Sequence, residues 1–196
     1  MATTDKLLLA FQYFDAANKL DPYTEVFQGR TYPKEVLYSI RMTERLNVLE
    51  PNASEALRLT ARCQHICRWE IPRESYDMNR EGYLRWRQDL KKFHVKKASE
   101  ILEKVGYHQE IITKVGFLLE KKQLKKNEET QALEDVICLV FLEYYFEPFA
   151  HKHPADKTID ILQKTWRKMS EKGRKTALKL PLSKFAMDLI SKAITA

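Results

Sequence analysis

EETQALEDVICLVFLEYYFEPF, residues 128–149, is the most apolar stretch of the chain. Its apolar residues recur every three or four positions, so Leu139, Leu142 and Phe146 fall on one face of a helix. Asn127 precedes the stretch and can cap its first turn. The pattern predicts one long buried helix over 128–149.

The same periodicity recurs along the rest of the chain, between stretches that contain proline or glycine. Ser54 is the expected cap of one of these helices, and Gly106 the expected end of another. Only 5 of the 196 residues are glycine, too few for the many tight turns of a sandwich or barrel. We predict an all-α fold of about eight helices, with loops at 23–32 and 72–79. The other seven helices are expected at 5–19, 33–49, 54–69, 80–105, 108–122, 155–171 and 182–194.

The composition, 44% hydrophobic and 31% charged, is that of a folded chain. No proline-rich or low-complexity linker divides it, so we expect one compact domain over 1–196. No apolar run approaches the ~18 residues of a membrane span. The first residues lack the basic start and cleavage site of a signal peptide, so we expect a cytoplasmic protein without a membrane partner.

The three cysteines, Cys63, Cys67 and Cys138, do not have the spacing of a disulfide framework or a zinc site. Cys63 and Cys67 lie four residues apart, which predicts buried positions on one helix face. The net charge of +7 allows an anionic partner such as phosphate, a nucleotide or RNA. A solvated lysine surface is the alternative explanation for this charge.

Asp135 shares the apolar face of the 128–149 helix, where a carboxylate is costly to bury alone. We therefore expect it to be paired with a base, a hydrogen-bond network or a metal. Glu134 lies about 100° round the same helix and is either a second ligand or a surface charge.

The 80–105 helix has an expected apolar stripe, with His94 one residue off it and in line with Arg87 and Lys91. A histidine beside a row of cations is a candidate anion cradle, and a solvated helix edge is the alternative. The residues of the expected stripe are Tyr83, Trp86, Leu90, Phe93 and Ile101.

Gln64 and His65 lie in an apolar segment of the 54–69 helix. A buried histidine needs a partner for each ring nitrogen. One arrangement brings His65, His94 and Asp135 from three helices to one pocket, whereas a lone histidine more often serves as a structural hydrogen bonder. We keep both interpretations.

Arginine alternates with tryptophan and tyrosine between residues 68 and 97. Arginine forks suit phosphate and aromatic rings suit stacking on bases, so the segment is a candidate binding surface for RNA or a nucleotide. Arg–Glu pairing and core aromatics are the alternative. The candidate substrate-binding residues are Arg41, Arg68, Trp69, Arg73, Arg87 and Lys91.

The order of these segments resembles the HD-domain superfamily of metal-dependent phosphohydrolases. YSIRMTERL, LRLTARCQHICRWEIP, FHVKKASEIL and QALEDVICLV carry the resemblance, and Asp135 matches the family's last aspartate. The resemblance implies an HD-like core at about 30–150 and later helices packed on it. It also implies catalytic roles for His65, Glu134 and Asp135. His65, His94 and Asp135 would hold a divalent Mn, Mg, Zn or Fe ion.

Two positions depart from the HD pattern. Tyr38 stands where a histidine is expected, and Gln64-His65 stands at the histidine–aspartate pair. Neither tyrosine nor glutamine replaces an imidazole well at a transition-metal site. With these two substitutions, two alternatives stay open. His65, His94 and Asp135 bind a metal whose other ligands are water, or the pocket binds an anion and no metal.

QHICRWEIPR, GYLRWR, LKKFH and QALEDVICLVFLEYYF also resemble an uncharacterised family, domain of unknown function 4202. Three hypotheses follow. The first is a divergent phosphohydrolase acting on a nucleotide or another phosphorylated small molecule. The second is a non-catalytic RNA- or nucleotide-binding module, and the third is a helical scaffold. The sequence also allows a homodimer.

Overall fold

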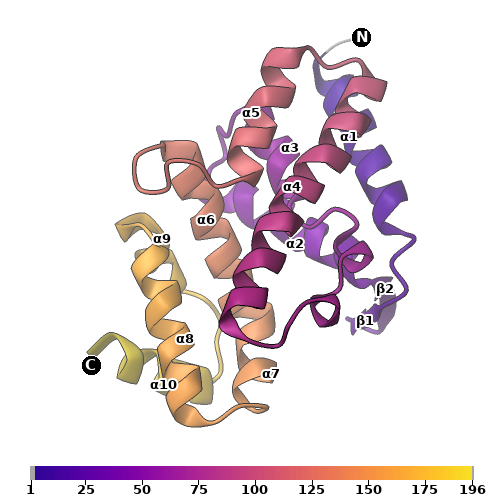
Figure 1. Ribbon diagram of the computed structural model, residues 1–196. Coiled ribbons are helices and arrows are strands. Elements are labelled where there is room, and N and C mark those ends of the chain that lie inside the picture. The colour runs from indigo at the N-terminus through magenta and orange to yellow at the C-terminus, as the bar shows by residue number, and fades with distance from the viewer. Residues whose placement is uncertain (1–2, 196) are drawn as a thin grey trace. The chain divides into compact units, whose positions relative to one another are not determined.

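The computed structural model describes residues 3–195 and is almost entirely helical (Figure 1), as predicted. Among these residues no helix is both long and apolar enough to cross a membrane. The chain forms two compact units, 1–47 with 51–122 and 48–50 with 123–196. Whether they make up the single domain expected from the sequence stays a prediction.

In the first unit, helices α1, α3, α4 and α5 pack on one another, and α2 follows a short hairpin. The elements of this unit are α1 (Thr3–Asn18), β1 (Thr24–Phe27), β2 (Arg30–Pro33), α2 (Lys34–Leu49, except its last two residues), α3 (Glu55–Cys63), α4 (Arg80–Val105) and α5 (Gln109–Leu119). Short 3₁₀ turns at Arg68–Glu70 and Arg73–Ser75 connect α3 to α4.

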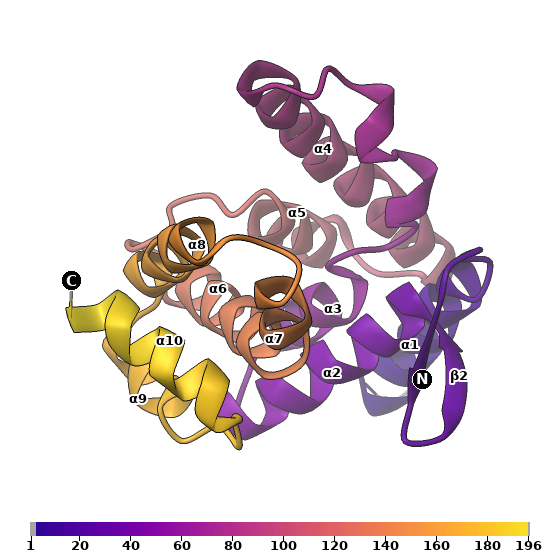
Figure 2. The same cartoon turned by 90° about the horizontal axis from the view of Figure 1, so that it is seen from below.

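In the second unit, α8, α9 and α10 gather around the long segment that contains α6 and α7 (Figure 2). Its elements are α6 (Glu128–Val140), α7 (Phe146–Ala150), α8 (Ala155–Lys168), α9 (Glu171–Ala177) and α10 (Lys184–Thr195). A π-helical turn at Phe141–Tyr145 joins α6 to α7, so the helix expected over 128–149 is one rod with a local change of pitch.

Residues 23–32 were expected to be a loop, and this prediction is wrong. β1 and β2 pair antiparallel, with Phe27 opposite Arg30. Gln28 and Gly29 both have positive φ, 49° and 74°, as a tight two-residue hairpin turn requires. Strands of four residues are too short to give a clear alternation in the sequence.

The helix expected over 54–69 ends early, at Cys63. Cys67 has left-handed backbone angles (φ 51°), so it does not share a helix face with Cys63 as the spacing suggested. Both cysteines are nevertheless free and buried, as predicted. The buried side chain of Asn18 holds this turn, because its Oδ1 accepts a hydrogen bond of 2.9 Å from the backbone N of Cys67.

The buried face of α4 differs from the predicted stripe. It follows every fourth residue, through Gly82, Trp86, Leu90, His94, Ala98 and Leu102. Tyr83, expected in the stripe, is 46% exposed. His94 therefore lies inside the core rather than at its border.

The long helix expected over 155–171 also needs correction. It ends at Lys168, and Ser170 caps a separate helix α9, by accepting a hydrogen bond of 3.0 Å from the backbone N of Gly173. Gly173 lies buried inside α9.

Candidate anion-binding pocket

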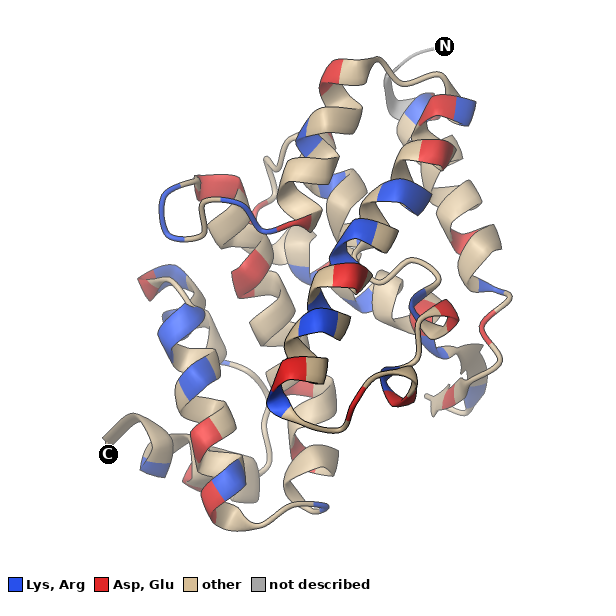
Figure 3. Cartoon of the chain, in the orientation of Figure 1, with Lys and Arg blue, Asp and Glu red and all other residues tan. Residues whose placement is uncertain are grey.

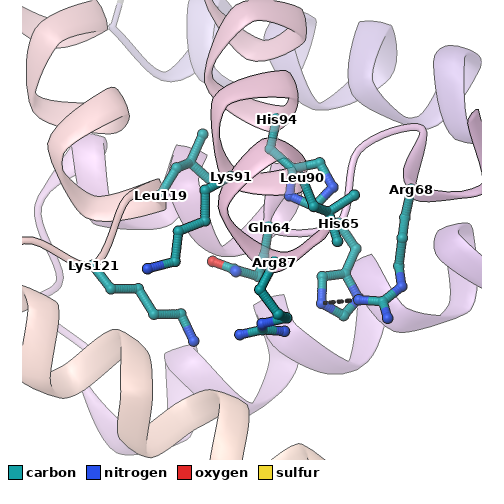
Figure 4. Close-up of a pocket in the computed structure, with 9 residues that line it drawn as sticks. All are labelled: Gln64, His65, Arg68, Arg87, Leu90, Lys91, His94, Leu119 and Lys121. Atoms are coloured by element: carbon teal, nitrogen blue, oxygen red, sulfur yellow. Dashed lines mark hydrogen bonds between the residues drawn. The ribbon is translucent and has the colours of Figure 1, made fainter. Parts of the chain in front are cut away.

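A pocket in the first unit gathers polar side chains from three places, the chain after α3, the middle of α4 and the end of α5 (Figure 4). Its empty space is about 280 Å³, including the open mouth. The lining residues are Gln64, His65, Arg68, Arg87, Leu90, Lys91, His94, Leu119 and Lys121. None of these lining residues is acidic.

The backbone turn after α3 presents His65 and Arg68 to this pocket. Gln64 closes α3, and the left-handed Cys67 then redirects the chain into the 3₁₀ turn that begins at Arg68. A continuous helix would have carried these side chains round its axis by about 100° per residue.

His65 is held on three sides. Its ring stacks on Tyr38 with the centroids 4.0 Å apart and the planes inclined by 9°. Nε2 lies 3.3 Å from the Nη1 of Arg68, and Nδ1 lies 3.4 Å from Oε2 of Glu35. Because a guanidinium only donates, Nε2 is the acceptor and Nδ1 carries the proton that faces the carboxylate.

The surroundings keep His65 neutral. Burial, followed by the charges of Arg68 and Arg87, holds its pKa well below the usual 6.5. Burial also raises the pKa of Glu35 to about 7, although Arg68 and Lys34 oppose this shift. Glu35 was missed in the sequence, because an acidic residue in the first turn of a helix is common and needs no other explanation.

Four cations surround the pocket. Arg68 lies with its guanidinium carbon 5.0 Å from the centroid of the Trp86 ring, and Lys91 Nζ donates a hydrogen bond of 3.1 Å to the carbonyl of Glu120. Figure 4 shows Arg87 and Gln64 between the lysines, Lys91 and Lys121, and the His65–Arg68 pair. Basic residues recur along the whole of α4 (Figure 3), and the pocket draws on two of them.

Gln64 and His94 are buried in the pocket wall with unused hydrogen-bonding atoms. Their side chains are 5% and 4% exposed, and neither Gln64 Oε1 nor His94 Nε2 has a partner. Burial, then His65 and Arg68, holds the pKa of His94 well below 6.5. An unpartnered buried polar atom costs about 1–3 kcal/mol, and a water or ligand group that pairs with either atom would remove this cost.

The structure brings His65 and His94 together, with ring centroids 6.0 Å apart. Asp135 belongs to the second unit and has partners there. Its carboxylate accepts hydrogen bonds from the backbone N of Ser170 (2.8 Å), from Ser170 Oγ and from Gln131 Nε2 (3.1 Å). The partner that the sequence demanded for Asp135 is thus a hydrogen-bond network that caps α9.

Glu134 is also buried in the second unit, where its Oε1 lies 3.6 Å from Lys168 Nζ. Over residues 3–195, no group of three or more His, Cys, Asp or Glu side chains is arranged to hold a metal ion.

The remaining predicted substrate-binding residues do not line the pocket. Arg41 is buried, 2.7 Å from Glu25 Oε1, and stacks over Phe27, so it fastens the hairpin to α2. Arg73 donates hydrogen bonds to three carbonyls of the loop before α4. Trp69 is half-buried in the 3₁₀ turn next to Arg68.

The fold and the pocket define a helical protein with a cationic, imidazole-lined site. The chain belongs to the family described as Domain of unknown function (DUF4202), which matches residues 9–190. No curated protein and no solved structure matches the chain.

Proposed function

We propose that the pocket binds the phosphate group of a phosphorylated small molecule. The observation that carries the proposal is the convergence of Arg68, Arg87, Lys91 and Lys121 on one small cavity without an acidic lining residue. Arginine forks donate two parallel hydrogen bonds to phosphate oxygens, and lysine adds charge at short range.

The size of the pocket favours a small ligand. Its empty space of about 280 Å³ includes open solvent at the mouth, so the enclosed part of the pocket is smaller than this figure. A phosphate at the mouth, within reach of the four cations, agrees with this size, and any attached carbons would extend outward. A nucleotide would place its phosphate inside and its base beyond the mouth.

Hydrolysis of the bound phosphate ester stays a prediction from the HD resemblance. His65 supports it in one respect, because a carboxylate at Nδ1 orients an imidazole for proton transfer at Nε2. The fit to a divalent metal is poor. Four cations surround the two histidines, and Asp135 uses its carboxylate in the cap of α9. No step of the proposal uses a metal.

Binding of an extended RNA is a weaker alternative. Of the arginines between 68 and 87, Arg68 and Arg87 line the pocket, and Arg73 is committed to loop carbonyls. A small anion needs only the pocket, whereas RNA needs a continuous basic surface, and its affinity falls steeply as salt is added.

Titration calorimetry with inorganic phosphate and a panel of nucleotides tests the proposal. The Arg87→Ala variant should bind phosphate about 10-fold or more weakly, because a hydrogen bond to a charged group contributes about 1.5–3 kcal/mol. Arg85→Ala is the matched control, since Arg85 lies on the same helix, exposed and paired with Glu81. Absence of phosphate binding, or an equal loss in both variants, would overturn the proposal.

A further inference from the structure

Gln64 and His94 set one part of the pocket apart from the cations. Both residues line the pocket, both are neutral and more than nine-tenths buried, and each has one atom without a hydrogen-bond partner. They come from separate elements, the end of α3 and the middle of α4. Figure 4 draws both side chains among the residues that line the pocket together with the cations, so the wall of one pocket contains both kinds of group.

The chemistry of these two side chains selects a kind of ligand group. A phosphate oxygen without a proton only accepts hydrogen bonds, and it cannot satisfy Gln64 Oε1. An ammonium group only donates, and the surrounding cations would repel it. A hydroxyl both donates and accepts, so it can pair with either end of the Gln64 amide and with His94 in either tautomer.

Two leucines add an apolar surface to the pocket. Leu90 and Leu119 line the pocket beside the polar groups, where they can contact the carbon atoms of a short ligand. The pocket thus combines cations for an anionic group, neutral polar side chains for hydroxyls and apolar side chains for a carbon chain.

We propose that the ligand of this pocket is a phosphorylated polyol or sugar, with its phosphate on the arginines and lysines and a nearby hydroxyl on Gln64 and His94. This inference rests on the proposed phosphate-binding function and names its ligand class. The proposal concerns non-covalent binding only.

The test compares two probes with the same number of carbons, glycerol phosphate and propyl phosphate, by titration calorimetry. Wild-type protein should bind glycerol phosphate about 10-fold more tightly, because propyl phosphate leaves the buried polar atoms without partners. The preference should fall to less than about threefold in Gln64→Leu and in His94→Leu. Gln88→Leu, at an exposed position of α4, is the matched control and should keep the full preference.

The outcomes separate this inference from the function on which it rests. Equal affinity of the wild-type protein for the two esters would overturn it, since water would then serve the two buried atoms. A preference that persists in the Gln64→Leu/His94→Leu double variant would also overturn it. If neither ester nor inorganic phosphate binds, the phosphate-binding function itself fails. The wild-type comparison needs no variant to fold.

Discussion

Glu35 offers the sharpest quantitative prediction, because its carboxyl is only 14% exposed and lies beside neutral His65. Its pKa rises from 4.5 to about 7 on folding. The folded protein therefore binds the Glu35 proton more tightly than the unfolded chain does. Stability from this group is complete below pH 4.5 and is lost as the pH rises toward about 7.

The rise of the Glu35 pKa from 4.5 to about 7 corresponds to about 3 kcal/mol in the free energy of unfolding. Between about pH 5 and about pH 8, linkage gives a loss of about 2.5 kcal/mol from Glu35 alone. Glu35→Gln removes this loss, because glutamine resembles the protonated acid. Relative to the wild-type protein, the variant should gain about 2.5 kcal/mol over that range.

Urea unfolding of both proteins at the two pH values measures this gain. The change in unfolding free energy between the two pH values is compared between the variant and the wild-type protein. The contribution of His65, which has the opposite sign in this range, is common to both proteins and largely cancels. The exposed Glu74→Gln, measured alongside, corrects for the general effect of removing one negative charge. If the difference between Glu35→Gln and wild-type protein does not change with pH, Glu35 is ionised in the folded protein throughout this range and its pKa is not raised.

Other substitutions test contacts that shape the two units. Gly173→Ala should destabilise the protein by about 1–3 kcal/mol in thermal unfolding, because a Cβ there would lie 2.6 Å from Asp135 Cγ. Asp135→Asn should lower the unfolding free energy by about 1–3 kcal/mol, since the amide cannot accept from both donors of Ser170 and from Gln131. Unchanged stability would contradict either prediction. Asn18→Ala should cost about 1–3 kcal/mol and also weaken phosphate binding, because Asn18 holds the Cys67 turn. Full phosphate affinity in this variant would show that the turn does not position the pocket.

Local chemistry explains what could be predicted of the fold. Ser54 and Asn127 cap α3 and α6 as expected, and Gly106 ends α4 with φ 87°. Each of these helix-end signals depends on a few neighbouring residues, so it can be read from the sequence alone. The early end of α3 depends on a contact between residues far apart in the sequence, and the short hairpin strands have no clear local pattern. The end of α3 involves Asn18, forty-nine residues before Cys67.

The candidate site was predictable for the residues on α4 and only in part for the others. The spacing of Arg87, Lys91 and His94 is a property of one helix, and these residues do share a pocket. Glu35 and Lys121 reach the same region from other elements, and no local pattern marks them. Asp135 was recognised as a buried carboxylate in need of a partner, but its partner Ser170 lies thirty-five residues away.

We propose above that an oxyanion binds among Arg68, Arg87, Lys91 and Lys121. A crystal of the protein grown with tungstate, a heavy oxyanion that resembles phosphate, would reveal such binding through the anomalous signal of tungsten. The proposal predicts a strong peak in this pocket, within hydrogen-bonding distance of the two guanidinium groups. A peak found only elsewhere, or none at a saturating tungstate concentration, would contradict it.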